Sequence, residues 1–543
     1  MARLMPVWAS ILGVFIVVTS IYGGYHYFSP IPYWDQWDGY VGFYKQLQEG
    51  RFGVFWAQHM EHRIVFSRIL FALDAKFFGG WNAFTVIMNY VLLVLVCWVI
   101  WREYDRGASK QHSSWLIGGL IGGFILAWCQ SENLKWGFQS QGIAVYLFSF
   151  LAFAVYSHAD QVSRRIVLAV LFAWLAVISM GNGIATFAVL IGQAILLRRS
   201  WKESLIFSIV GILAAAIYFL HYAKPLLPVD PSVVHIAFVP AKFFAVFLGS
   251  PFFYVFHSIE FSATMGVCYL VIACFAIGTM FFRRTVTPYR AFLAAIIAMV
   301  IVAALGAAHG RWMIGLESAV SSRYTTPPLM GYTALALLVL DMVKSRTART
   351  LAALVPLITL TAIATYQSES YGSNQYLFEW KLALLGQKIG LDHLEYDAKL
   401  YPPTRHDNLI VSAEFAAADN LGPYGRGWLH DAGIVKFDAS RVDSALCDGF
   451  MESISTDAVG RVAEGWAVAR QFQESSLLIV LVNANGQTVG YGVTGRSRPD
   501  VKRANRAVPS DSGWVGFAQI GGPSLRGFVY VGGKFCPLNF IGH

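Results

Sequence analysis

Charged side chains are scarce in this sequence. Only 13% of its 543 residues are Asp, Glu, Lys or Arg, whereas 56% are hydrophobic. Soluble domains carry about 25% charged residues, and a water-soluble fold of this length has too little interior to bury so much apolar surface. The composition therefore excludes an ordinary soluble protein and predicts a protein that folds largely in lipid.

Cysteine is also scarce, and the six residues include no C-x-x-C zinc spacing. Cys447 and Cys536 lie in the polar C-terminal part, where we expect a disulfide if that part is exported. The first apolar run, at about 7–23, lacks a small-x-small cleavage site, which predicts an uncleaved transmembrane helix. The remaining cysteines lie in apolar runs and are expected to be buried hydrophobes: Cys97, Cys129, Cys268 and Cys274.

The net charge of +9 is not interpreted as a nucleic-acid-binding patch. Basic residues lie in short gaps between apolar runs, which is the pattern of membrane topology. The runs predict about 11 transmembrane helices, near 7–23, 83–101, 114–130, 141–157, 166–180, 184–198, 203–221, 262–281, 291–308, 327–343 and 350–366.

Lys and Arg set the predicted orientation. The basic loops are predicted to be cytoplasmic, which places the N-terminus inside and everything after about residue 367 on the periplasmic or extracellular side. The apolar segment 235–257 is interrupted by Pro240, Gly249 and Pro251. It is predicted to be re-entrant or interfacial, because a true span there would invert the later loops against the charge rule.

The transmembrane domain is predicted to cover 1–366, and other regions flank it. Its first periplasmic loop, 24–82, contains an amphipathic helix predicted to begin at Asp38 and to lie on the membrane surface. A connector with helical stretches follows at 367–399. Residues 400–543 are predicted to form a soluble β-sandwich, because short β-type runs flank the hairpin signal Asn485-Gly486.

Unusual polar residues gather in five clusters in the predicted outer loops. From the first to the fifth, they are Trp34–Asp38, His59–Arg63, Glu132–Gln139, Gly181–Gly183, and His309–Arg311 with Ser322–Tyr324. The topology predicted from Lys and Arg places all five clusters on one membrane face. This agreement was not used to derive the topology. One composite site is therefore favoured over five separate features.

The first cluster has a structural alternative. Asp35 and Asp38 can cap a helix or be solvated. Tryptophans at 34 and 37 flank them, which is typical of a membrane-interface cleft or of stacking against sugar rings.

The second cluster has two alternatives. His59, Glu61 and His62 lack the H-E-x-x-H spacing of a zinc hydrolase, so a dedicated zinc site is not expected. Arg63 and Arg68 can either extend to lipid headgroups or bind a phosphate.

The other clusters also have structural alternatives. Glu132 and Trp136 lie four residues apart and can anchor a helix at the interface. Gly181–Gly183 is most simply a tight turn. Arg323 can be a positive residue at the outer end of a helix.

The first outer loop resembles that of the GT-C superfamily of integral membrane glycosyltransferases. It runs from Asp35 through a helix ending at Gly50 to His62-Arg63-Ile64 and then Phe77-Phe78-Gly79-Gly80-Trp81-Asn82. The last stretch is similar to the F-G-x-N type turn in relatives of lipid A aminoarabinose transferases and protein O-mannosyltransferases. The likeness covers about the first 100 residues. One departure is Gln36, where the family often has a second acidic residue.

The resemblance implies an inverting glycosyltransferase of the bacterial inner membrane. Its donor would be a polyprenyl-phosphate sugar, and its acceptor a cell-envelope glycan or lipid such as lipopolysaccharide. Asp35 would be the general base, with Asp38 as the second candidate, and His62, Arg63 and Arg323 would bind the donor phosphate. The implied contacts to sugar or acceptor are Trp34, Trp37, His59, Glu61, Glu132, Trp136, Gln139, Asn182 and Tyr324.

The metal dependence and the role of the C-terminal domain stay open in the sequence. Relatives differ in their need for a divalent cation, and Asp35 and Asp38 with His59 can hold Mg²⁺ or Mn²⁺ transiently. Trp466 and Trp514 of the C-terminal domain either belong to its core or bind glycans at its surface.

Three other functions compete with glycosyl transfer. A flippase or transporter of lipid-linked sugars places polar residues near the bilayer midplane, often in inverted repeats, and the sequence has neither feature. A membrane acyltransferase usually needs a histidine within the membrane. A non-catalytic envelope assembly protein has no need of Asp35 with basic residues behind it.

Overall fold

The computed structural model divides into two compact units, and each is described by itself. The helical unit comprises Met1–Phe28, Gly53–Leu70 and Phe84–Gly372. The mixed unit comprises Ser29–Phe52, Phe71–Ala83 and Ser373–His543. The structure describes residues 4–159, 164–225, 229–231, 238–391, 394–456, 460–470, 476–519 and 524–540.

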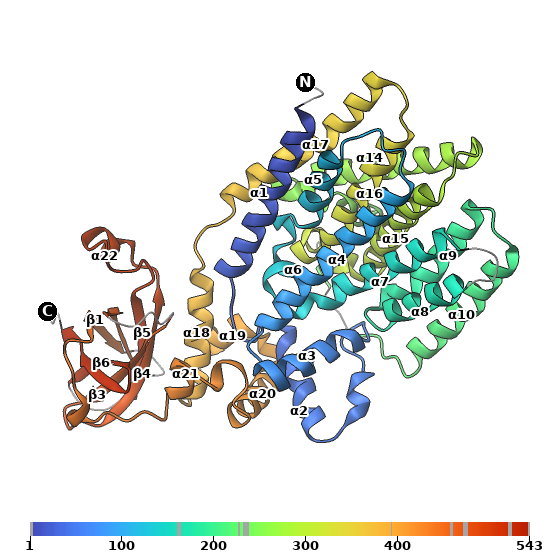
Figure 1. The fold of residues 1–543 in the computed structure, drawn as a ribbon. Helices are drawn as coiled ribbons and strands as arrows, with labels where there is room; N and C mark the ends of the chain where they lie inside the picture. The colour runs from blue at the N-terminus through green and yellow to red at the C-terminus, as the bar shows by residue number, and fades with distance from the viewer. Residues whose placement is uncertain are drawn as a thin grey trace. The chain divides into compact units, whose positions relative to one another are not determined.

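The helical unit consists of helices that lie side by side (Figure 1). They are α1 (Met5–His26), α4 (Ala83–Gly107), α5 (Ser114–Ile125), α6 (Ser131–Lys135), α7 (Ser140–Ser157), α8 (Arg164–Val177), α9 (Ala185–Leu196), α10 (Trp201–Phe219), α12 (Val239–Leu248), α13 (Ser250–Phe256), α14 (Ile259–Phe282), α15 (Pro288–Arg311), α16 (Thr326–Met342) and α17 (Arg346–Glu369). Hydroxyl side chains accept from the first helical turn of several helices, as is usual for N-caps. These caps are Ser113, Ser200, Ser258, Thr287 and Ser345.

Among the described residues, eight helical stretches are long and apolar enough to cross a membrane. A ninth candidate is the pair α12 and α13, which bends by 75° and corresponds to the segment that we expected to be re-entrant or interfacial. All eleven predicted spans fall on helices. However, α8 has only 14 residues, α9 has 12 and α16 has 17. A multi-pass helical membrane protein is confirmed, and the predicted total of about 11 exceeds the number of helices with spanning length.

Small residues allow the helices to approach closely. Gly13 of α1 faces Gly119 of α5, and a Cβ added to Gly13 would lie 2.8 Å from the Gly119 carbonyl oxygen. A Cβ added to Gly119 would overlap the carbonyl of Ala9. Lipid offers no hydrophobic driving force between helices, so close backbone packing of this kind is a main source of their association.

The mixed unit contains most of the first loop together with the C-terminal part. Its helices are the π-helix η1 (Trp37–Gly42), α2 (Phe43–Gln48), α18 (Gln375–Lys388), α19 (Leu394–Leu400), α20 (His406–Ala418), α21 (Trp428–Asp431) and α22 (Pro499–Ala504). Helix α3 (Val65–Phe78) contributes its second half to this unit. The helix predicted after Asp38 is confirmed as η1 and α2, and it ends before Gly50, whose φ of +80° suits the left-handed end of a helix.

The β-structure begins later than predicted and forms one sheet. Helices α20 and α21 occupy the start of the region 400–543, which we expected to be all β. Eight strands then form one sheet in the order β7-β6-β3-β4-β5-β2-β1-β8, so the predicted sandwich of two sheets is wrong. The strands are β1 (Cys447–Thr456), β2 (Arg461–Ala469), β3 (Leu478–Asn483), β4 (Thr488–Arg496), β5 (Gly513–Ala518), β6 (Leu525–Val531), β7 (Lys534–Pro537) and β8 (Asn539–Phe540).

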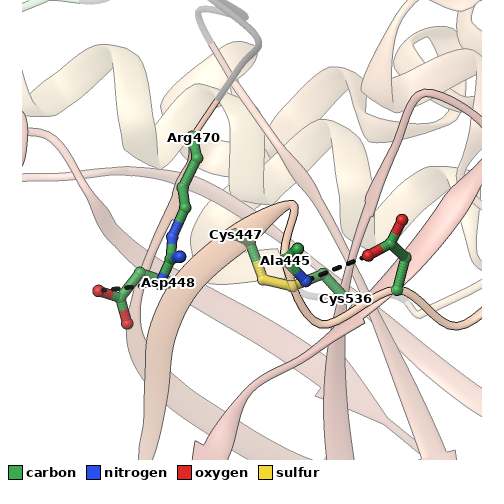
Figure 2. Close-up of a disulfide and its surroundings, with 6 residues drawn as sticks. Ala445, Cys447, Asp448, Arg470 and Cys536 are labelled. Atoms are coloured by element: carbon green, nitrogen blue, oxygen red, sulfur yellow. Dashed lines mark hydrogen bonds and ion pairs between the residues drawn. A yellow bond between two sulfur atoms is a disulfide. The ribbon is translucent and has the colours of Figure 1, made fainter.

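The predicted disulfide is confirmed between Cys447 of β1 and Cys536 of β7, and Figure 2 shows it beside the ion pair of Arg470 with Asp448. Strands β1 and β7 lie near opposite ends of the strand order. A bond between them requires the sheet to curl on itself in the manner of a barrel. The hairpin predicted at Asn485-Gly486 is also confirmed, between β3 and β4.

Alternate residues of β3 pack into two different cores, as the period of a strand requires. Val480 and Val482 pack with side chains of α18. Ile479 and Leu481 pack on the other face with Trp514. Trp514 is fully buried, which excludes it as a surface glycan ligand.

Candidate functional site

Asp38 is held by residues from the C-terminal part of the mixed unit. The hydroxyl of Tyr401 donates to Oδ2 of Asp38, and Nη1 of Arg405 lies 3.0 Å from the same oxygen. Burial and the neighbouring Asp38 carboxylate raise the pKa of Tyr401, so the phenol stays a donor. The carboxylate of Asp38 is therefore engaged by two donors, neither of which the sequence pattern had indicated.

Asp35 has a different environment. It is half-buried, and its carboxylate makes no hydrogen bond or ion pair with any residue of the described ranges. The next residue, Gln36, is buried and bridges two parts of the mixed unit. Its Oε1 accepts from the Tyr33 amide at 3.1 Å, and its Nε2 donates to Asn82 Oδ1 at 2.9 Å. The glutamine that departs from the GT-C pattern thus fixes the backbone beside the Asp35 carboxylate.

The two tryptophans of the first cluster differ in exposure. Trp34 is 43% exposed. Trp37 is fully buried at the start of η1, so its predicted role as a substrate contact is wrong. The first cluster therefore offers Trp34 and Asp35 to a ligand.

Helix α3 carries a buried carboxyl group that was not among the predicted site residues. Asp74 of α3 accepts from the Tyr40 hydroxyl at 2.7 Å and from the Asn82 amide at 3.2 Å. Burial raises its pKa above the usual value. Asp74 thereby ties α3 to the Gly79–Asn82 turn that resembles the family motif. The signal in the sequence that could have indicated Asp74 is an acidic residue on the apolar face of a helix.

In the helical unit, the second, third and fifth clusters meet around Tyr324. Both carboxylate oxygens of Glu61 lie 3.0 Å from Nη2 of Arg311. The guanidinium groups of Arg311 and Arg323 lie 5.7 and 5.5 Å from the Tyr324 ring centroid. Glu132 accepts from the Arg323 amide at 3.0 Å. Residues from three separate loops therefore form one charged group.

The fourth cluster lies beside the second. A Cβ added to Gly181 would lie 3.2 Å from Nδ1 of His62, and Asn182 donates to the Tyr146 hydroxyl at 3.1 Å. Burial lowers the pKa of His62 to about 4, and Arg311 adds to this effect. His62 is thus neutral near pH 7 and can serve a phosphate only as a hydrogen-bond donor.

Arg63 has a structural role in this conformation, which overturns its prediction as a phosphate ligand. It is 4% exposed. Its three guanidinium nitrogens donate to backbone carbonyls: Nε to Tyr218 at 2.8 Å, Nη1 to Trp56 at 2.6 Å and Nη2 to Leu220 at 2.6 Å. Arg311 of the fifth cluster is a better candidate, because it is half-buried and its guanidinium group lies near the Tyr324 ring, as does that of Arg323.

The remaining predicted contacts in the helical unit are aromatic or amide side chains. His59 packs edge to face on Phe138 at 5.2 Å, and Trp136 stacks on the same ring at 5.7 Å. Trp136 and Gln139 are each only 7% exposed. Their burial leaves little of either side chain open to a ligand in this conformation, and their roles as substrate contacts stay predictions.

The chemistry available is that of carboxylates and guanidinium groups. Within the described ranges, no group of three or more His, Cys, Asp and Glu side chains is arranged to hold a metal ion. Arginine binds phosphate oxygens in a fixed, bidentate geometry, and an unpartnered carboxylate can accept a proton. Comparisons with protein-family models, with curated proteins and with solved structures find no match to this chain.

Proposed function

We propose that this protein is an inverting membrane glycosyltransferase that uses a polyprenyl-phosphate sugar as its donor. The acceptor is a hydroxyl group of a cell-envelope glycan or lipid. The observation that carries the proposal is the contrast between two carboxylates of one loop. Asp35 is half-buried and has no partner in the described ranges, whereas Asp38 is held by Tyr401 and Arg405. A general base needs a carboxylate that is free to accept a proton.

The proposed reaction is a single displacement. Asp35 takes the proton of the acceptor hydroxyl while the hydroxyl oxygen forms a bond to the anomeric carbon. The bond from that carbon to the phosphate oxygen breaks on the opposite face, and the phosphate leaves with the electron pair. Negative charge grows on the leaving phosphate, and positively charged groups of the protein are proposed to stabilise it.

The proposed location is the outer face of a bacterial inner membrane, with the N-terminus cytoplasmic. The basic residues of the alternate loops support this orientation. The Cys447–Cys536 disulfide supports an oxidising compartment for the mixed unit.

The test is sugar transfer by the purified full-length protein in detergent, with a panel of radiolabelled polyprenyl-phosphate sugars. We expect wild type to consume one donor. Asp35→Asn should lower kcat by about 100-fold or more, the contribution of a general base, without lowering the thermal midpoint. Asp38→Asn should lower the thermal midpoint, because Arg405 loses its ion-pair partner.

Asp419→Asn is the matched control, since Asp419 is an exposed carboxylate of the same unit. It should leave transfer unchanged. Full activity of Asp35→Asn would remove Asp35 as the base. No consumption of any donor by wild type would favour the flippase or assembly alternatives.

A further inference from the structure

Four aromatic residues of the mixed unit form a connected cluster that includes Trp34, the residue before Asp35. We call them the aromatic platform: Tyr33, Trp34, Tyr376 and Trp380. The Tyr33 and Trp380 rings are stacked, with centroids 4.4 Å apart and planes 20° apart. Tyr376 meets the edge of Trp380 at 5.2 Å, and Trp34 lies 6.0 Å from Tyr33. Two distant parts of the sequence thus contribute rings to one place.

The periodicity of α18 explains why it presents two of these rings. Phe378, Leu382 and Leu385 are buried in the core of the curled sheet. Tyr376 and Trp380 are four residues apart and therefore lie one above the other on a helix. Residue 380 is about 200° around the helix from residue 378. The face that carries the platform is thus not the face that anchors α18.

Trp34 is held in an unfavourable backbone conformation. Its φ is +47°, in the left-handed region that residues other than glycine rarely adopt. Such a conformation costs on the order of 1–3 kcal/mol and persists only when its surroundings enforce it. Here the Trp34 amide donates to the Leu400 carbonyl at 2.9 Å, and its carbonyl accepts from the Trp37 amide at 3.0 Å. The strain is retained although the Trp34 ring stays 43% exposed.

We infer that the aromatic platform is a subsite for a sugar ring of the acceptor. A pyranose has an apolar face of C–H groups and polar hydroxyls at its edge. An exposed indole matches the face, and phenol and indole groups supply polar contacts at the edge. The four platform side chains carry no formal charge, so they suit a neutral sugar rather than a phosphate group.

The subsite deepens the proposed function and rests on it for the role of Asp35. Asp35 directly follows Trp34 in the chain, and the subsite is proposed to bring hydroxyls at the edge of the sugar ring within reach of its carboxylate. Holding a reacting hydroxyl beside a catalytic group in this way lowers the activation barrier of the reaction. Trp34 and Trp380 are thus proposed as acceptor-binding residues, and Tyr33 and Tyr376 as their support.

The test is saturation-transfer NMR on the full-length protein in a detergent without a sugar headgroup. The probes are the methyl glycosides of glucose, galactose, mannose and N-acetylglucosamine, so no donor and no turnover are required. We expect wild type to transfer magnetisation to the ring protons of one face of at least one probe. Trp34→Ala and Trp380→Ala should weaken this binding by about tenfold, and Trp34→Phe should retain it.

Phe52→Ala is the matched control, because Phe52 is a 72% exposed aromatic residue of the same loop. It should leave binding unchanged. No transfer to any glycoside in wild type, or full binding by Trp34→Ala, would overturn the inference. If wild type binds no glycoside but Trp34→Ala weakens the binding of lipid vesicles, the inference is overturned and the platform is a membrane anchor. Asp35→Asn should still bind the glycoside, so failure of the proposed transfer reaction is recognised separately from failure of the platform.

Discussion

Removal of the Cys447–Cys536 bond should destabilise the curled sheet by an amount that the loop length defines. The bond joins residues separated by 89 positions. The chain-entropy relation for a loop of this length gives about 15 cal/mol/K, or about 4.6 kcal/mol at 25 °C. We therefore expect the double substitution Cys447→Ser and Cys536→Ser to lower the free energy of unfolding of the sheet by about that amount.

Hydrogen exchange followed by mass spectrometry measures this loss in the full-length protein. A change of 4.6 kcal/mol corresponds to an increase of about 2,000-fold in the opening equilibrium. Peptides from β3 should show it, since the core residues of this strand are fully buried and exchange only when the sheet opens. Peptides from α15 in the helical unit serve as the internal control. Unchanged protection of β3 in the double variant would refute the loop-entropy reasoning for this sheet.

Two further predictions concern the helical unit. Gly119→Ala should lower the thermal midpoint in detergent by about 5 °C, because its Cβ overlaps the Ala9 carbonyl, whereas Gly142→Ala, with nothing within 4 Å of the added atom, should not lower it. Equal midpoints for the two variants would contradict the close contact of α1 with α5. The pKa of His62 is lowered to about 4 from about 6.5 in an unfolded chain, so the unfolded state binds more protons between these values. Stability should therefore fall as the pH drops from about 6.5 to 4, and His62→Gln should flatten this dependence in thermal melts; an unchanged slope would show that other groups cause it.

The apolar segments could be predicted because composition over a long window marks them. Composition does not fix where a helix begins and ends. The predicted number of spans, about 11, therefore exceeds the number of described helical stretches that are long enough to cross a membrane. Helix α8 stops at Val177, shortly before the Gly181–Gly183 turn. Helix α16 has prolines at 327 and 328 in its first turn. Helix α8, with 14 residues, is shorter than the predicted span 166–180, whereas α16 has 17 residues, as many as the predicted span 327–343.

The β-region shows the difference between local and distant signals. The hairpin at Asn485-Gly486 could be predicted because turn chemistry is local. The single curled sheet depends on pairs such as β3 with β6 and β2 with β5, which the sequence does not reveal. Helix α20 was missed because turn residues around it, including Pro402 and Gly422, gave the whole region the composition of loops and strands.

The candidate site was predictable in residue type but not in side-chain direction. Trp34 and Trp37 looked equivalent, yet η1 turns Trp37 into the interior. Arg63 looked available for phosphate, yet it binds the carbonyls of Tyr218 and Leu220, more than 150 positions away. Partners at such distances leave no trace in local sequence.

The discontinuity of the mixed unit has a consequence for its biosynthesis. Ser29–Phe52 must fold with Ser373–His543, which the ribosome makes only after the intervening helices. At about 5–20 residues per second, the first loop waits on the order of half a minute for Tyr401 and Arg405 to emerge. During this interval its aromatic side chains lack their final partners. A chain that terminates early at any point in the helical unit therefore lacks the residues with which this loop forms its unit.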